Sequence, residues 1–434
     1  MASETMQKAP RRYEKMRDSG VEWIGMVPSH WEIVRARAHF MQTNERGNQT
    51  PVLLAASQKF GVCPQDQLEG VVKVSVGTDL QQFKSVHRND FIISLRSFQG
   101  GFELSPFEGV CSPAYQVFHT DDAYDVKYLR FLFKDERFID HMNSLTVGIR
   151  DGKNIKYSDF SNSLIILPPL DEQRAIAKYL SQVSAKIDTL IGEIKASIEE
   201  YKAWKASIIY EAVTKGLDPN AEMKDSGVEW IGEIPAHWAF RKMKQVAQFA
   251  PKCDFSRLEN DALITFAPME CIRNGYFENR GKQLNTITGS YTPYSEGDIV
   301  FAKVTPCFEN GNICIMKNLY SGVGLGSSEL FVLRARSIST EYLFYYLQHP
   351  GFVQRACASM TGTGGLKRVS SDFIQNCPLP IPTEEEQGEI VDFLNRRCTA
   401  IEQLISEKSA LIEELESYKR SLIYEVVTGK RRVC

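Results

Sequence analysis

The stretch PPLDEQRAIAKYLSQVSAKIDTLIGEIKASIEEYKAWKASIIYEAVTKG, residues 168–216, predicts one long helix. Its two prolines close a short apolar strand, Leu164–Leu167, and Asp171 and Glu172 then place negative charge where the dipole of a helix favours it. No proline and a single glycine interrupt the run before Gly216, which is typical of a C-terminal cap. Such a helix extends about 67 Å, which is too long for one small domain to bury.

The helical text occurs twice. Asp171–Lys215 and Glu385–Gly429 match at 19 of 45 positions, and Thr383 with Glu386 forms a capping-box pattern ahead of the second copy. Apolar residues recur in both copies at steps of three and four, which is typical of a helix that pairs with another helix. The expected seam residues are Ile187, Leu190, Ile194, Ile198, Tyr201, Trp204 and Ile208 in the first copy, and Ile401, Leu404, Leu411, Leu415, Tyr418 and Leu422 in the second, with Lys408 interrupting. Equivalent units pair most simply about a pseudo-two-fold axis, so we expect antiparallel helices and a C-terminal helix that ends near the N-terminus.

A second repeated text precedes each helix. Asp18–Trp31 reads DSGVEWIGMVPSHW and Asp225–Trp238 reads DSGVEWIGEIPAHW, and 11 of these 14 positions match. The residues between the repeated texts barely align, so each repeat is a variable domain followed by a long helix. The expected division is an N-terminal segment 1–17, a variable domain 18–167, a spacer helix 168–216, a connector 217–224, a variable domain 225–379, a spacer helix 380–429 and a tail 430–434.

The variable domains are rich in β-branched and aromatic residues between turn residues. The expected strands are Phe91–Leu95, Ala114–Phe118, Asp298–Ala302 and Leu330–Leu333, and the expected shorter helices are Asp125–Ser144 and Thr340–Ser359. The expected fold class is therefore α+β. It has two α/β, β-rich domains separated by two long antiparallel coiled-coil helices, with an internal pseudo-two-fold repeat.

Composition limits the classes of function. The 434 residues are 43% apolar and 24% charged, and no apolar run is long enough for a membrane span or a secretory signal. The ten cysteines include no CxxC pair, so we expect neither a metal site nor a disulfide framework, and a cytoplasmic location. The net charge of −3 exerts no general attraction on nucleic acid, so DNA binding would need a local patch or a more basic partner.

Catalytic signatures are missing from the sequence. It contains no GxxxxGK[ST] phosphate loop, no dinucleotide fingerprint, and no HExxH, GxSxG or kinase motif. The segment Leu167–Leu170 reads LPPL, which lacks the amide and the aromatic residue of an amino-methyltransferase motif. We therefore expect a non-catalytic chain.

The order and duplication of these segments resemble the specificity subunits of type I restriction–modification systems. The resemblance rests on Pro168–Ile176 and Pro380–Ile390, on the SxIYExVT segments Ser207–Thr214 and Ser421–Thr428, on the two GVEWIGxxPxHW texts, and on Asp90/Ser112 with Asp298/Ser327. It implies two target-recognition domains, each of which reads half of an asymmetric bipartite sequence in double-stranded DNA. It also implies helices that dock two modification subunits, with restriction subunits in the full complex. S-adenosylmethionine, ATP and Mg²⁺ are then expected on the partners, with no cofactor, metal or membrane contact on this chain.

Candidate DNA contacts are polar and basic residues in loops between the predicted strands. Arg and Lys suit guanine edges, Asn and Gln suit adenine, and any of them suits a phosphate; each is equally open to reading as a solvated surface residue. The candidates are Arg96, Ser97, Gln99, Arg150, Lys153, Asn154 and Lys156 in the first domain, and Lys303, Thr305, Asn310, Lys317, Lys367 and Arg368 in the second. Arg150/Lys153 and Lys367/Arg368 stand out because they follow equivalent glycine-containing loops.

Two other readings stay open at the sequence level. The chain fits a coiled-coil scaffold that presents two β-rich domains to protein or glycan partners, and it also fits an enzyme with an unfamiliar site. The repeated tryptophans favour structural anchors between the variable domains and the helices over a docking surface. The repeated outward positions Glu193, Glu199, Glu200, Lys205 and Glu211, with Glu407, Glu413, Glu414, Lys419 and Glu425, are consistent with a docking face or a solvated helix face.

Overall fold

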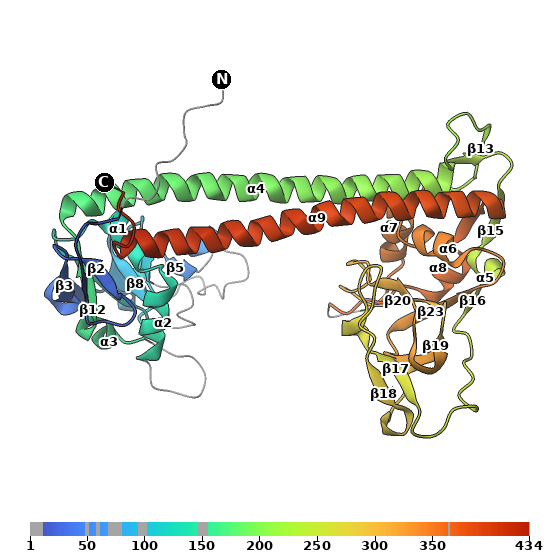
Figure 1. Cartoon of the computed structure of the whole chain (residues 1–434), viewed down its shortest axis with the longest axis horizontal. Coiled ribbons are helices and arrows are strands. Elements are labelled where there is room, and N and C mark those ends of the chain that lie inside the picture. The colour runs from blue at the N-terminus through green and yellow to red at the C-terminus, as the bar shows by residue number, and fades with distance from the viewer. Residues whose placement is uncertain are drawn as a thin grey trace. The chain divides into compact units, whose positions relative to one another are not determined.

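The computed structural model describes residues 12–47, 52–57, 61–67, 80–93, 102–145, 155–362 and 365–433. The chain divides into two compact units (Figure 1). The first unit takes the residues up to Ile194 together with those from Ala410 onward, and the second takes Lys195–Ser409. Each unit therefore combines one variable domain with the start of one long helix and the end of the other.

The variable domain of the first unit is built on a four-stranded antiparallel sheet in the order β4-β11-β8-β9. Its elements are β1 (Met16–Asp18), β2 (Met26–Pro28), β3 (Glu32–Arg35), β4 (Phe40–Thr43), β5 (Leu54–Ser57), β6 (Gly61–Pro64), β7 (Lys84–Val86), β8 (Phe91–Ile93), β9 (Glu103–Leu104), β10 (Gly109–Cys111), β11 (Gln116–Thr120), α1 (Val126–Leu132), α2 (Glu136–Ser144), α3 (Tyr157–Asn162) and β12 (Leu164–Leu167). Buried phenylalanines fill the space between this sheet and helices α1–α3, with ring centroids of Phe102 and Phe160 4.8 Å apart.

The variable domain of the second unit repeats that sheet as β16-β23-β20-β21 and adds another. Its elements are β13 (Met223–Asp225), β14 (Glu233–Pro235), β15 (Ala239–Lys242), α5 (Met243–Val246), β16 (Ala247–Phe249), β17 (Leu263–Ala267), β18 (Gly281–Gln283), β19 (Thr292–Ser295), β20 (Ile299–Ala302), β21 (Ile313–Ile315), β22 (Val323–Gly326), β23 (Leu330–Ala335), α6 (Thr340–Tyr346), α7 (Pro350–Ala358), α8 (Ser371–Asn376) and β24 (Pro378–Ile381). The added sheet has the order β18-β17-β22-β19, and its β17–β22 pair is parallel. The mixed helix and strand content confirms the predicted fold class.

Each predicted shorter helix is two helices in the structure. α1 ends at Leu132, and Asp135 starts α2, because its carboxylate accepts hydrogen bonds from the backbone N–H groups of Arg137 and Phe138. In the second unit the ring of His349 accepts from the N–H of Phe352, and Pro350 occupies the first turn of α7. Predicting one continuous helix was wrong here, because the capping side chain and the proline favour a new start over continuation.

Two long helices account for the repeated helical text: α4 (Leu170–Lys215) and α9 (Glu384–Val427). The capping box at the start of α9 is confirmed, since the N–H of Thr383 donates to Glu386 at 3.0 Å and the N–H of Glu386 donates to the Thr383 hydroxyl at 3.3 Å. Gly216 and Gly429 follow the helix ends with φ of 75° and 72°, a conformation that a side chain disfavours.

The two helices run antiparallel within each unit. In the first unit the ammonium of Lys419 lies 2.6 Å from a carboxylate oxygen of Asp188, and in the second unit that of Lys205 lies 2.5 Å from Glu402. Asp188 precedes Lys205 on α4, whereas its partner Lys419 follows Glu402 on α9, so the two helices run in opposite directions. Lys205 and Lys419 therefore form ion pairs with the opposite helix, although their side chains stay 17% and 27% exposed, and the prediction that both point outward differs from the structure.

The seam differs in part from the predicted one. Ile187, Ile191, Ile194 and Ile198 are buried on α4, whereas Leu190 and Trp204 keep 43% and 48% of their surface exposed. On α9 Ile401 and Leu422 are buried as predicted, but Leu404, Leu411 and Tyr418 are 38–45% exposed. The buried residues repeat every seven positions, as in Ile187 and Ile194 or Ile191 and Ile198, which is typical of a pair of helices in a coiled coil. The exposed residues lie one position away from this repeat, as Leu190 does from Ile191.

Each long helix ends against the variable domain of the other repeat. The hydroxyl of Tyr128 donates to the carbonyl of Val427 at 2.9 Å, and the equivalent Tyr342 donates to the carbonyl of Val213 at 2.9 Å. The structure agrees with a C-terminal helix that ends near the N-terminus, because the ammonium of Lys430 donates to the carbonyl of Ile24 at 2.6 Å and the guanidinium of Arg432 lies 5.7 Å from the centre of the Tyr13 ring.

The repeated tryptophans anchor the variable domains to the starts of the helices. The indole N–H groups of Trp31 and Trp238 donate to Glu172 and Glu386 at 3.1 Å, and the neighbouring histidines contact the same two carboxylates. Both indoles are 1% exposed. Their structural role is therefore confirmed. No helix among the described residues is long and apolar enough to cross a bilayer.

Candidate nucleic-acid interface

Four predicted contact residues of the second variable domain come together. Lys303 leaves the sheet directly after β20, and the chain continues through Thr305 beside the segment that holds Lys367 and Arg368. The N–H of Thr305 donates to the carbonyl of Lys367 at 3.0 Å, and the N–H of Val369 donates to the carbonyl of Lys303 at 2.9 Å. We call Lys303, Thr305, Lys367 and Arg368, with Glu329, the basic cluster.

Thr305 serves the architecture of the basic cluster. Its hydroxyl donates to the carbonyl of Gly365 at 3.0 Å and accepts from the N–H of Lys367 at 3.0 Å. The hydroxyl therefore forms both of its hydrogen bonds with the segment 365–367, and it holds the backbone that leads to Lys367 and Arg368.

Arg368 is held by a carboxylate that the sequence reasoning missed. Its Nε donates to Glu329 Oε2 at 3.0 Å and its Nη2 donates to Glu329 Oε1 at 2.6 Å. These hydrogen bonds lower the pKa of Glu329 against the effect of burial, so the carboxylate is ionised at neutral pH. Glu329 lies 39 positions before Arg368, and no sequence pattern links an acidic residue at that distance to this arginine.

Lys303 and Lys367 differ in what their ammonium groups contact. That of Lys303 donates to the carbonyl of Ser328 at 2.8 Å and lies 5.1 Å from the centre of the Phe331 ring. Burial lowers the pKa of Lys303, while the charge of Glu329 raises it. Lys367 is exposed, and among the described residues its ammonium has no ion-pair partner. Lys367 is therefore the more accessible cation of the two.

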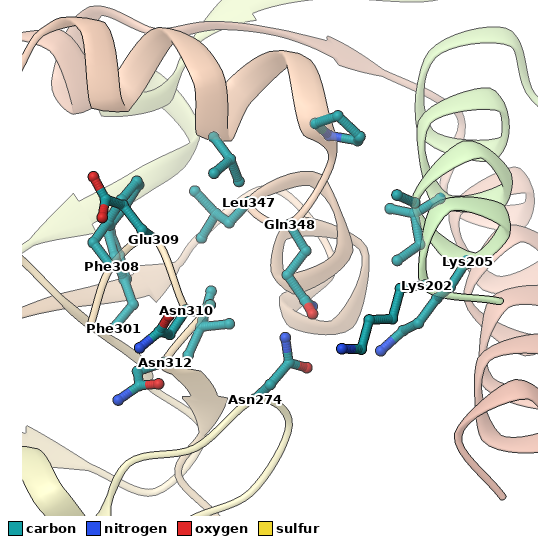
Figure 2. A pocket seen from close by; sticks show the side chains of 16 residues that line it. Lys202, Lys205, Asn274, Phe301, Phe308, Glu309, Asn310, Asn312, Leu347 and Gln348 are labelled. Carbon is teal, nitrogen blue, oxygen red and sulfur yellow. The ribbon is translucent and has the colours of Figure 1, made fainter. Parts of the chain in front are cut away.

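Asn310 and Lys317 lie at two cavities beside the long helices of the same unit. Asn310 lines a cavity of about 570 Å³ together with Phe301, Phe308 and Lys202 (Figure 2). Lys317 lines a second cavity of about 400 Å³ and forms a 3.2 Å ion pair with Glu341. Asn310 therefore lines a cavity although it belongs to the loop that follows Thr305, where its N–H donates to the carbonyl of Pro306 at 2.9 Å, whereas Lys317 follows β21.

Most candidates of the first variable domain fall outside the described residues: Arg96, Ser97, Gln99, Arg150, Lys153 and Asn154. Lys156 is described, and it is exposed directly before α3. Its N–H donates to the carboxylate of Asp159 at 3.2 Å, so its backbone caps this helix while its side chain remains accessible.

Comparison with protein families decides the class of this architecture. The sequence model described as the type I restriction modification DNA specificity domain matches residues 51–200 and 235–416. The chain belongs to this family. The family is described as a DNA specificity domain, and relatives of this chain are named as specificity subunits of type I restriction enzymes.

Individual relatives agree with this assignment. The MjaVIII specificity subunit of Methanocaldococcus jannaschii is 29% identical over 432 residues, 94% of each protein. The EcoAI specificity subunit of Escherichia coli is 32% identical over 212 residues, which are 48% of this chain and 35% of that protein. The EcoEI subunit of Escherichia coli is 34% identical over 177 residues, 40% of this chain and 30% of that protein. The aligned part is thus about a third of the length of these two Escherichia coli relatives.

Solved structures share the fold. A chain from a study of complex assembly and conformational transition of the type I R-M system superposes with a TM-score of 0.68 at 16% identity, over 92% of this chain and 98% of that one. The HsdS subunit from Thermoanaerobacter tengcongensis gives a TM-score of 0.50 at 17% identity, over 93% and 98%. At these identities the likeness concerns the fold alone.

Proposed function

We propose that this chain selects the DNA target of a type I restriction–modification enzyme, and that each variable domain reads one half of an asymmetric bipartite sequence. The proposal rests on one observation: the two variable domains share the same structural core but differ in the segments that surround it. Both units share the four-stranded sheet and its closing helices, but only the second, among the described residues, adds the β18-β17-β22-β19 sheet. Two different variable domains on one shared scaffold are suited to bind two different half-sites.

The paired helices are the proposed docking surface for two modification subunits. Leu190 and Tyr418 in the first unit, and Trp204 and Leu404 in the second, are large apolar side chains with 38–48% of their surface exposed. All four occupy the same seven-residue position beside the seam. Aromatic and aliphatic groups in such rows suit burial against a partner helix.

The chemistry of the complex then belongs to its other subunits. S-adenosylmethionine is proposed to bind the modification subunits, and ATP with Mg²⁺ the restriction subunits. The nine described cysteines are free thiols, which suits a reducing cytoplasm.

Mapping of methylated adenines tests the proposal. A host that carries the modification subunit encoded with this chain is sequenced with and without the gene for this chain. We expect methylation at one bipartite motif only when this chain is present. Identical methylation maps in both hosts would contradict a role in target selection.

A further inference from the structure

Arg368 has one occupied and one open hydrogen-bonding edge. The planar guanidinium carries five N–H groups, and Glu329 takes the Nε–H and one Nη2–H in a bidentate pair. The edge formed by Nη1 and the second N–H of Nη2 has no partner among the described residues. This open edge presents two parallel donors, which is the geometry that binds two adjacent acceptors.

The backbone beneath Arg368 is fixed from two sides. Its N–H donates to the carbonyl of Thr361 at 2.8 Å, and the N–H of Thr361 donates to the carbonyl of Arg368 at 3.0 Å. On the other side the residue bridges to Val304. Glu329 is also held, because its carbonyl accepts from the N–H of Lys303 at 2.9 Å and its N–H donates to the Ser327 hydroxyl at 3.2 Å. The open edge is therefore preorganised, and binding costs little further side-chain entropy.

The charge of Glu329 selects the kind of acceptor. A phosphate that approached Arg368 would also approach the carboxylate, and the repulsion would cancel much of the attraction. A base edge carries no net charge, so Glu329 does not repel it and the two N–H donors can form hydrogen bonds with it. Guanine presents O6 and N7 as adjacent acceptors in the major groove, and a bidentate arginine is their usual partner.

We propose that Arg368, oriented by Glu329, reads one guanine of the half-site that the second variable domain binds. This inference rests on the proposed function and adds a base identity to it. Lys367, which is exposed and unpaired among the described residues, contacts a phosphate beside that guanine.

The test uses the complex of this chain with its modification subunit and duplexes that carry the mapped motif. Each guanine is replaced in turn by 7-deazaguanine, which lacks the N7 acceptor but pairs normally with cytosine. We expect one replacement to weaken binding by the wild-type complex about tenfold. The same replacement is expected to leave the affinity of the Arg368→Ala complex unchanged, because the contact is already gone.

Two further variants separate orientation from attraction. Glu329→Gln keeps the size of the side chain but removes the charge, and we expect it to reduce the effect of the critical 7-deazaguanine. Lys367→Ala is the matched control at the adjacent position. It should weaken binding to all duplexes alike and lower the slope of log affinity against log salt by about 1, as the loss of one phosphate contact does.

The outcomes distinguish the two proposals. If the wild-type complex binds no motif specifically, the proposed function fails. If it binds a motif but every 7-deazaguanine affects the wild-type and Arg368→Ala complexes equally, the reading of guanine by Arg368 is wrong while the proposed function stands. If Arg368→Ala fails to assemble, the comparison of wild type with Glu329→Gln decides: an equal response of these two to every replacement overturns the inference.

Discussion

The carboxylate of Glu386 interacts with three side chains. It closes the capping box with Thr383, accepts the indole N–H of Trp238 at 3.1 Å, and contacts the ring of His237 at 2.8 Å. Burial opposes its ionisation, but the hydrogen bonds from Trp238, Thr383 and His237 outweigh burial and lower the pKa of Glu386 to about 2. In the first repeat Tyr13 takes the place of the capping threonine, and hydrogen bonds from Tyr13, His30 and Trp31 lower the pKa of Glu172 against the effect of burial.

A pH-dependent contribution to stability follows from this pKa. Because the folded pKa lies below the ordinary value of 4.5, the carboxylate stabilises the fold above about pH 4.5, and this stabilisation is lost as pH falls toward 2. Glu386→Gln is expected to lower the free energy of unfolding by about 1–2 kcal/mol at pH 7, after allowance for solvent screening, and by roughly half as much at pH 3. Urea unfolding at both pH values measures this. Glu385→Gln is the control, and an equal loss for Glu386→Gln at both pH values would contradict the assignment.

At this scale residue type predicted Lys303, Thr305, Lys367 and Arg368 of the basic cluster, but neither Glu329 nor the role of each residue. Lys367 and Arg368 were identified because basic residues follow equivalent loops in both repeats. Sequence alone could not show that Arg368 is bound by Glu329, since that pairing depends on three chain segments meeting beside β20. Asn310 and Lys317 have the same polar character, yet the fold turns them toward the cavities.

Among the elements, the long helices were the most predictable and their contact face the least. Their length, caps and glycine ends follow from local signals. The choice of seam does not, because Leu190 and Ile191 are adjacent apolar residues and either fits a helical period. The structure buries Ile191 to 8% exposure and leaves Leu190 at 43%, since only the former keeps the seven-residue step through Ile194 and Ile198.

These two neighbours provide a matched test of the seam. Ile191→Ala removes buried methyl groups and is expected to lower the free energy of unfolding by about 1–3 kcal/mol, whereas Leu190→Ala is expected to cost less than about 1 kcal/mol. Chemical unfolding of the two variants measures the difference. Equal losses would show that both residues are in the seam.

The same Leu190→Ala variant bears on docking. If the exposed apolar row binds modification subunits, Leu190→Ala and Trp204→Ala should leave the isolated chain folded and weaken assembly by about tenfold or more. Titration of the modification subunit, followed by analytical ultracentrifugation, measures this. Lys186→Ala, at an exposed position of the same helix outside the predicted docking residues, is the control for a general effect of surface truncation.

For the whole molecule, the duplication in the sequence predicted a nearly cyclic chain, and contacts within each unit explain why. The end of α4 contacts the β13–β14 segment, where the hydroxyl of Tyr210 donates to the carbonyl of Ile231 at 3.0 Å. The end of α9 contacts the equivalent β1–β2 segment through Lys430 and the carbonyl of Ile24. What the sequence could not provide was the division into units, because each unit takes parts of both repeats.

A circular permutant tests this cyclic layout. The guanidinium of Arg432 lies 5.7 Å from the centre of the Tyr13 ring, so a short glycine–serine linker should join Val433 to Arg12 without strain in a permutant that omits residues 1–11 and 434. Opening the chain between residues 217 and 224 then removes the natural connector of the second unit, while the linker supplies an equivalent connector in the first unit. We expect this permutant to fold, with a thermal midpoint within about 5 °C of wild type, since it loses no buried contact. A permutant opened between Gly192 and Glu193 carries the same linker but interrupts α4, and it should be markedly less stable. If both permutants unfold at the same temperature, or if the first fails to fold, the connector contributes more than continuity, and the two repeats are not interchangeable around the cycle.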